Sequence, residues 1–417
     1  MRFKIYCSFL SLFGLSAGLM AQNNTSPYSI LGIGDIQSGY YGKWSGMANA
    51  QTALSSNRYI NQANPAAYSQ LDNQFFNFEI SGRYKYTNYI SNATAAVNTT
   101  SADLSMEKVA LALKLSKRWG SGVGIMPFSI SNYSFFSNKN IQGTNLQTTV
   151  YNKGSGAITQ AYWANSFSIN KNLSIGIQTS FLFGSLQQEE DLATDISTGS
   201  IVTTRNIYLR SPYLTYGFQY KGKLNKKWQL ALGGTYSNKT NLSAEYSLHV
   251  TDAGTDVVAQ EVIANNSYNI PRTYNGGVAL TYDNKLTFAA DYKNQDWSTL
   301  NYKGLNYALV NSGRYAAGVE YAKKLNIFNT TIEKTFYQAG FFYNKSYLQI
   351  NQEQLKDYGL TLGIGANSKR NSLGYQFSLE LGSRGTVNKG LIKENYSQVN
   401  FTLSYRDFWF TKGRKYD

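Results

Sequence analysis

Large apolar side chains alternate with small or polar ones along most of this sequence, and this period of two restricts the fold more than any other feature. In residues 399–406, apolar side chains occupy every odd position and polar side chains every even position. Successive side chains of a β-strand point to opposite faces, so such a segment forms a strand with one apolar and one polar face. The same alternation recurs in residues 109–115, 173–181, 228–232, 286–292 and 373–381. The sequence therefore predicts an all-β fold, either a soluble sandwich or a transmembrane barrel.

The connections between these segments distinguish the two architectures. Short joints rich in Asn, Lys or Gly fall at 118–121, 170–172, 225–227, 283–285 and 369–371, and a longer one lies near 324–331. Long polar stretches alternate with them, at 92–105, 138–152, 187–205, 238–266, 296–304, 344–354 and 385–394. Outer-membrane barrels keep short turns at one end and long loops at the other, whereas a sandwich has no reason to separate them. These joints predict a transmembrane antiparallel β-barrel of about fourteen strands, with both chain ends on the turn side.

The first residues have the three-part layout of a secretory signal peptide. Arg2 and Lys4 supply a basic start, residues 5–19 are mostly apolar, and Ala21 precedes the expected cleavage point. The apolar stretch is too short for a membrane-spanning helix. Cleavage would remove Cys7, the only cysteine, and with it any disulfide or thiolate metal site. We therefore expect the protein in the outer membrane of a bacterial cell, with both termini periplasmic.

The composition agrees with a barrel wall that has one face in lipid and the other in water. Aromatic residues make up 15% of the chain, with 34 tyrosines, and charged residues also make up only 15%. The formal charge is +15, and removal of Arg2 and Lys4 would leave it basic. The basic residues are scattered and lie mainly at turns. This favours contact with outer-membrane lipid and lipopolysaccharide over a nucleic-acid partner.

The remaining boundaries follow from the strand pattern. Residues 74–410 hold the alternating segments and end on the aromatic group 408–410, which suits a membrane interface. A terminal strand rich in aromatics resembles the sorting signal read by barrel-assembly machinery, but here a periplasmic tail, 411–417, follows it. The chain thus divides into a signal peptide (1–21), an N-terminal segment (22–73), the barrel and the tail.

The N-terminal segment carries two short motifs, a Gly-Met followed by small residues and an Asn-Pro-Ala just before the first strand. The motif residues are Gly46, Met47, Ala50, Asn64, Pro65 and Ala66. Together with the barrel, they resemble the FadL/TodX (OmpP1-like) family of outer-membrane transporters of long-chain fatty acids and other hydrophobic compounds. In that family the segment is a hatch that plugs the barrel lumen. The Ser-Pro-Tyr-Ser opening at 26–29 and the aromatic-basic ending resemble its Bacteroidota branch.

The Asn-Pro-Ala motif allows two interpretations. Pro65 fixes its own φ and favours an extended Asn64, whose side chain can hydrogen-bond to the nearby backbone. The motif then forms a rigid turn that locks the hatch to the wall. The alternative is direct contact with a ligand.

Pro127 lies inside the third expected strand, close to Gly122 and Gly124. Proline cannot donate a hydrogen bond to a neighbouring strand, so the strand must bulge or kink there. In the resembled family, a kink in the third strand opens a lateral passage from the lumen into the membrane. These three residues are therefore a lateral-gate candidate, and the alternative is a bulge that only shapes the barrel.

Catalytic and metal sites find no support in the sequence. The single histidine, His249, has no serine motif or carboxylate partner at a suitable spacing, so we expect no enzyme, cofactor or metal. Two functions remain. The first is passive transport of hydrophobic molecules, such as long-chain fatty acids, through a plugged barrel with lateral exit at the third strand. The alternative is a non-transporting barrel that is a subunit of an outer-membrane secretion or assembly complex, with a protein partner.

Overall fold

The computed structural model describes residues 26–37, 39–92, 100–140, 147–193, 200–252, 255–264, 268–300, 304, 306–327, 330–368 and 371–409. The expected signal peptide and tail lie outside these residues, as do parts of the expected loops. Within the described residues, no helix is long and apolar enough to cross a membrane.

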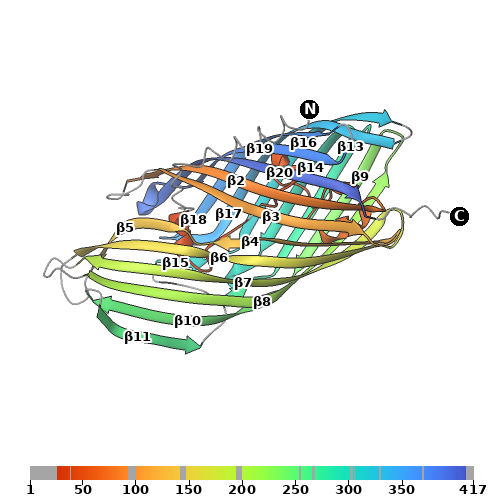
Figure 1. Cartoon of the computed structure of the whole chain (residues 1–417). Coiled ribbons are helices and arrows are strands. Elements are labelled where there is room, and N and C mark those ends of the chain that lie inside the picture. Colours follow the sequence, from red (N-terminus) through yellow and green to blue (C-terminus); the bar gives the residue numbers. More distant parts are fainter. Residues whose placement is uncertain are drawn as a thin grey trace, which may run out of the picture.

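One antiparallel sheet closes on itself to form a barrel of fourteen wall strands (Figure 1). In chain order the wall consists of β2 (Phe75–Ser91), β3 (Thr100–Lys114), β4 with β5 (Trp119–Ile130, Tyr133–Asn140), β6 (Gln147–Ser168), β7 (Leu173–Ala193), β8 (Ser200–Lys223), β9 with β10 (Trp228–Ser237, Thr240–Asp252), β11 with β12 and β13 (Thr255–Ala264, Tyr268–Ile270, Thr273–Tyr282), β14 (Leu286–Gln295), β15 with β16 (Tyr307–Leu309, Ser312–Ile327), β17 (Thr330–Ile350), β18 (Glu353–Asn367), β19 (Leu373–Gly385) and β20 (Ile392–Phe408). The first wall strand, β2, pairs with the last, β20, along its whole length. The predicted fold class is confirmed.

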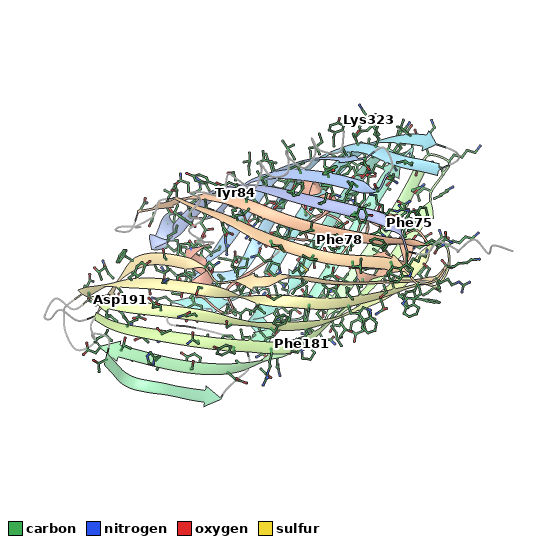
Figure 2. The ribbon with its side chains drawn as sticks, viewed as in Figure 1. Phe75, Phe78, Tyr84, Phe181, Asp191 and Lys323 are labelled. Carbon is green, nitrogen blue, oxygen red and sulfur yellow. The ribbon has the colours of Figure 1, made fainter. Side chains whose placement is uncertain are left out.

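The alternation of the sequence places apolar side chains outside and polar ones inside (Figure 2). On β2, Tyr84 is 42% exposed on the outer face, whereas Asn77 and Arg83 on the inner face are at most 3% exposed. Aromatic side chains also meet on neighbouring strands near both ends of the wall. The rings of Tyr292 and Tyr315 lie 4.7 Å apart near one end, and those of Trp228 and Tyr282 lie 5.0 Å apart near the other. Such aromatic girdles border the apolar band of outer-membrane barrels.

Short connections lie at one end of the barrel and long ones at the other, as predicted. We call these ends the turn end and the loop end. At the turn end, Asn170 Oδ1 accepts a hydrogen bond from the backbone N–H of Asn172 at 2.8 Å, which fixes a tight turn. At the loop end the strands run further than expected. The expected loop 187–205 contains the ends of β7 and β8, and the expected loop 238–266 contains β10 and β11. These strand ends lack strict alternation, so the pattern did not indicate them.

The loop end is not closed all the way around. Pairing of β3 with β4 stops at Val109 and Ile125, although β3 continues toward the loop end from Val109 back to Thr100. On the other side, pairing of β13 with β14 stops at Thr273 and Gln295, and β11 and β12 pair only with β10 among the described residues. The loop-side part of the sheet, formed by β5, β10 to β12 and the adjoining halves of β6 to β8, therefore projects from the closed barrel, and we call it the projecting sheet (Figure 1).

Residues 26–74 precede the wall and lie across the lumen, and we call them the N-terminal segment. They contain η1 (Pro27–Ile30), β1 (Asp35–Ile36), η2 (Lys43–Met47) and η3 (Pro65–Gln70), and two further 3-10 helices, η4 (Trp297–Leu300) and η5 (Asn388–Gly390), follow wall strands. The helix η2 contacts β16 to β19, whereas η3 contacts β3, β4, β6, β7 and β8 on the other side of the barrel. The segment thus reaches both sides of the wall from within.

The first and last described residues lie toward opposite ends of the barrel. Ser26 donates its backbone N–H to the carbonyl of Asn132 at 3.3 Å and its hydroxyl to Glu394, which lies near the loop end of β20. Phe408 pairs with Phe75 at the turn end. The chain termini themselves lie outside the described residues, so their location on the turn side stays a prediction.

Candidate functional site

The Gly-Met motif packs against glycines of the wall, which carry no side chain. A Cβ added to Gly46 would lie 2.5 Å from the Cα of Gly363 in β18, and one added to Gly318 in β16 would lie 2.6 Å from the Cβ of Met47. Met47 and Ala50 are fully buried. The backbones of the segment and the wall can approach this closely only because glycine lacks a Cβ.

Polar side chains of the wall hold the backbone next to this motif. Thr361 donates its hydroxyl to the carbonyl of Gly46 at 2.8 Å and accepts the N–H of Ala48 at 2.9 Å. Asp291 Oδ2 accepts the N–H of Gln51 at 2.8 Å and both the N–H and the hydroxyl of Thr52, at 2.9 and 2.7 Å. A buried carboxylate with three donors forms a strong anchor between the segment and β14.

The Asn-Pro-Ala motif forms the start of η3 and joins it to the wall. Asn64 Oδ1 accepts the N–H of Ala66 at 3.0 Å, while its Nδ2 donates to the carbonyls of Thr52 and Phe218, both at 2.9 Å. Pro65 lies against Gly176, where an added Cβ would be 2.4 Å from the Pro65 carbonyl carbon. The amide thus caps η3 and also links two parts of the segment to β8. This geometry matches the interpretation of a turn that locks the segment to the wall.

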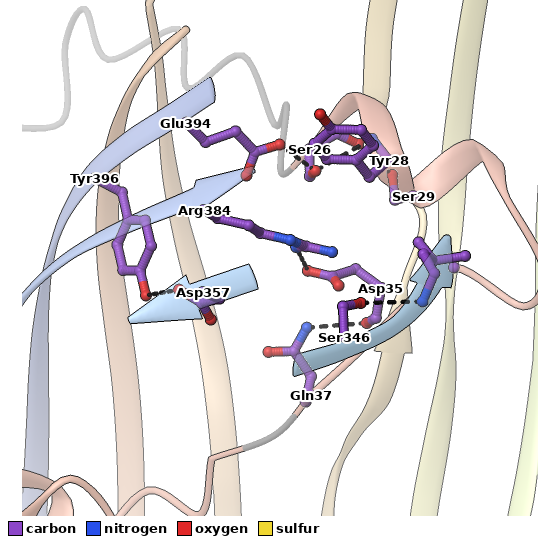
Figure 3. A network of polar contacts seen from close by, with 12 residues as sticks. Ser26, Tyr28, Ser29, Asp35, Gln37, Ser346, Asp357, Arg384, Glu394 and Tyr396 are labelled. Carbon is purple, nitrogen blue, oxygen red and sulfur yellow. Dashed lines mark hydrogen bonds and ion pairs between the residues drawn. The ribbon is translucent and has the colours of Figure 1, made fainter. Parts of the chain in front are cut away.

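The first part of the segment, residues 26–37, connects the two sides of the loop end, and we call it the clasp (Figure 3). On one side, Arg384 of β19 donates to Asp35 at 2.9 Å, and Tyr347 of β17 donates its hydroxyl to the carbonyl of Gly34 at 2.7 Å. On the other side, Ser129 of β4 donates its hydroxyl to the carbonyl of Ile33 at 2.7 Å. The clasp therefore ties the projecting sheet to the rest of the barrel.

The clasp also spans the interrupted seam between β3 and β4. Its short strand β1 pairs with β4 through Asp35 and Ile36, and the N–H of Gln37 donates to the carbonyl of Phe128 at 3.0 Å. On the β2 side of the seam, Arg83 donates to Gln37 Oε1 at 3.0 Å. Residues 35–37 thus occupy the edge of β4 that β3 leaves unpaired.

The three lateral-gate candidates fall in different places. Pro127 lies beyond the last β3–β4 pair and next to a register shift between β4 and β6, as expected for a proline in a strand. Gly122 and Gly124 lie within the paired part of β4. A Cβ added there would meet the ring of Tyr68 at 2.4 Å or the hydroxyl of Tyr162 at 2.6 Å. These glycines accommodate tyrosine rings inside the barrel, and Gly124 directly precedes the last paired residue, Ile125.

Buried ion pairs line the lumen. Lys43 of the N-terminal segment lies 3.2 Å from Glu320 and 2.8 Å from Glu333. Burial alone would lower the pKa of Lys43, but the two carboxylates outweigh it and raise the pKa. Lys108 of β3 pairs with Glu79 of the neighbouring strand β2 at 2.5 Å, and the same carboxylate accepts the N–H of Ile60 at 2.9 Å. Charged groups of the wall therefore find their partners on the N-terminal segment or on the adjacent strand.

Several cavities lie around the N-terminal segment, including one of about 70 Å³ beside Pro127. Toward the loop end, a cavity of about 110 Å³ is lined by charged residues that include Arg83, Lys85, Arg314 and Glu380. An apolar cavity beside Trp297 holds only about 30 Å³. Toward the turn end, a cavity of about 440 Å³ is lined by residues of the segment and of β8, β9, β13, β14, β16 and β17. The large spaces are polar, and the apolar space is small.

The wall residues that receive the segment were not identified from the sequence. Asp291, Thr361 and Arg384 are isolated polar residues in strands, and their partners lie more than two hundred residues away in the chain. The only available signal was an inward-facing glycine in several strands, such as Gly318 or Gly363, where alternation predicts a lumen-facing side chain.

Solved structures with a similar fold include a FadL homologue and two toluene transporters. A Pseudomonas aeruginosa FadL homologue has a TM-score of 0.65 at 12% identity, covering 91% of this chain and 100% of that one. The toluene transporter TodX of P. putida has a TM-score of 0.60 at 16% identity, covering 90% of this chain and 99% of that one. The toluene transporter TbuX of Ralstonia pickettii has a TM-score of 0.59 at 14% identity, covering 89% and 99%. At these identities the likeness is one of fold.

Sequence comparison gives a different name for the family. No curated protein sequence matches this chain. The family model described as BamG matches residues 1–417, the full length given. The expected likeness to FadL and TodX thus holds for the fold, and the chain belongs to the BamG family.

Proposed function

We propose that this protein is a barrel subunit of an outer-membrane assembly complex and does not conduct a solute. The observation that carries the proposal is a polar lumen that holds an anchored segment: Asp291, Thr361 and Asn64 fix the N-terminal segment, and Lys43 forms buried ion pairs with the wall. Pockets for drug-sized apolar ligands have volumes of roughly 300–1,000 Å³. The mainly apolar cavities here, beside Trp297 and beside Pro127, are far smaller, at about 30 and 70 Å³. The name of the BamG family also points toward an assembly complex.

The direct test is extraction of the full-length protein from its native membrane in mild detergent, followed by mass spectrometry of co-purifying proteins and lipids. We expect a protein partner at a constant molar ratio and no bound fatty acid. An unrelated barrel extracted from the same membrane is the control for nonspecific association. Bound fatty acid in the absence of a stoichiometric partner would contradict the proposal.

The second candidate is passage of a hydrophobic molecule, and two observations favour it. The fold is that of hydrocarbon channels, and the wall is interrupted between β3 and β4 beside Pro127. A solute leaving the lumen there would have to displace residues 35–37 from β4.

Replacement of Pro127 with Val separates the two candidates. The variant restores a backbone donor at this position and favours continuous pairing of β4. If a side exit operates, proteoliposomes that contain the Pro127→Val variant take up less fluorescent fatty acid than those with the wild type, although both proteins are equally folded. Our proposal expects background uptake in both proteins.

A further inference from the structure

The turn end carries an excess of unpaired positive charge. Six exposed cationic residues lie in or beside the short turns and make no ion pair with any described residue: Lys117, Arg118, Lys171, Lys223, Lys226 and Lys227. Asp407, at the end of β20, forms no ion pair with a described residue, but two other acidic groups there do. Asp283 pairs with Lys285, and Asp72 pairs with Arg406. The field at this end is therefore positive and attracts anionic groups.

The turn-end cavity of about 440 Å³ continues this pattern inside the barrel. Lys221 and Lys324 line it, and neither forms a salt bridge with an acidic residue in the described part of the chain, although Lys324 lies in the field of Glu333 and Glu320. The two glutamates of the cavity, Glu320 and Glu333, are both bound by Lys43. The charged lining of the cavity is thus three lysines and two glutamates, which gives a net charge of +1 and leaves no carboxylate without a cation.

Other lining groups are suited to a peptide. Ser55 and Asn57 of the N-terminal segment offer hydrogen-bonding groups, and Trp44 and Leu54 offer apolar surface. The loop end lacks this combination, because its cavity beside Arg384 contains the acidic groups of Asp35, Asp357 and Glu380.

We propose that the turn-end cavity binds an acidic segment of a partner protein. This inference rests on the proposed function and names the chemistry of one partner. A peptide is favoured over lipid headgroups because the cavity lies inside the wall. Headgroups in the surrounding bilayer reach the outer side of the rim and not Lys221 or Lys324.

Two adjacent lysines provide a matched test. Lys324 lines the cavity, whereas Lys323 points outward from the same strand, with its Nζ 5.9 Å from the ring of Tyr337 (Figure 2). The experiment measures binding of a fluorescently labelled peptide of alternating Glu and Ser to the full-length protein in lipid nanodiscs, by anisotropy. We expect Lys324→Glu and Lys221→Glu to weaken binding by about tenfold, and Lys323→Glu to change it by less than about twofold.

Several outcomes would overturn the inference. Absence of peptide binding to the wild type, or equal weakening by Lys323→Glu and Lys324→Glu, would show that general charge and not the cavity attracts the peptide. Lys324→Gln and the shift of the folded barrel on a gel without boiling distinguish a binding defect from a folding defect. If peptide binding fails while a stoichiometric partner still co-purifies, only the site is wrong. If no partner co-purifies, the proposed function fails independently.

Discussion

The loop end and the turn end of this barrel differ in how their charged groups are compensated. At the loop end, Arg384 lies 2.9 Å from Asp35 of the clasp, and Ser26 donates to Glu394. At the turn end, Lys221 and Lys324 face a cavity of about 440 Å³ and form no salt bridge with a described residue. The N-terminal segment supplies Asp35 and Ser26 to the loop half of the lumen, whereas in the turn half it supplies Lys43, which binds both glutamates of the cavity. The larger space and the two lysines without a salt bridge therefore lie in the turn half.

The largest expected effect comes from removing a paired charge at the loop end. Arg384→Met leaves the mostly buried carboxylate of Asp35 without its cation, and we expect the free energy of unfolding to fall by about 3–5 kcal/mol. Urea unfolding in detergent micelles measures this change, and hydrogen exchange over residues 26–37 should rise with it.

The control for this variant is an exposed pair on the projecting sheet. Arg210 lies 3.0 Å from Glu245, with the side chains 68% and 58% exposed. Arg210→Met should change stability by less than about 1 kcal/mol. Equal losses in the two variants would mean that burial by the clasp does not set the strength of the loop-end pairs.

An intermediate effect is expected where the segment is anchored between the two ends. A Cβ on Gly277 would lie 2.2 Å from Asp291 Oδ1 and 2.9 Å from Thr52 Cβ, whereas one on Gly276 would meet nothing within 4 Å. Gly277→Ala should cost about 1–3 kcal/mol through crowding, and Gly276→Ala less than about 0.5 kcal/mol. The same unfolding assay compares the two, and equal effects would disprove the close contact between segment and wall.

The smallest effect is expected at the turn end. Lys221→Met removes a cation that has no acidic partner in the described part of the chain, so stability should change by less than about 0.5 kcal/mol. Thermal unfolding of the purified protein measures it. A loss above about 1 kcal/mol would indicate that Lys221 already has a strong partner, contrary to the contrast between the two ends.

The strands were predictable because alternation is a local property. In β20, residues 399–406 alternate strictly, and the structure places Val399 and Phe401 outside and Asn400 and Thr402 inside. Beyond the aromatic girdle the strands of the projecting sheet lose this alternation, so the expected loop 187–205 proved to be mostly strand. The proline at 127 indicated a disturbed strand, but not that residues 35–37 would pair with its free edge.

The sequence alone determined that this chain forms a barrel of alternating strands with short turns at one end, since these features depend on neighbours along the chain. The motif around Asn64 and Pro65 also indicated a rigid segment before the wall. Only the tertiary structure decided which charges are paired, that Ser26 lies near the loop end, and that Lys324 faces a cavity while Lys323 faces outward. Those properties depend on distances between residues far apart in sequence, such as Asp35 and Arg384, which are fixed only when the barrel closes around the segment.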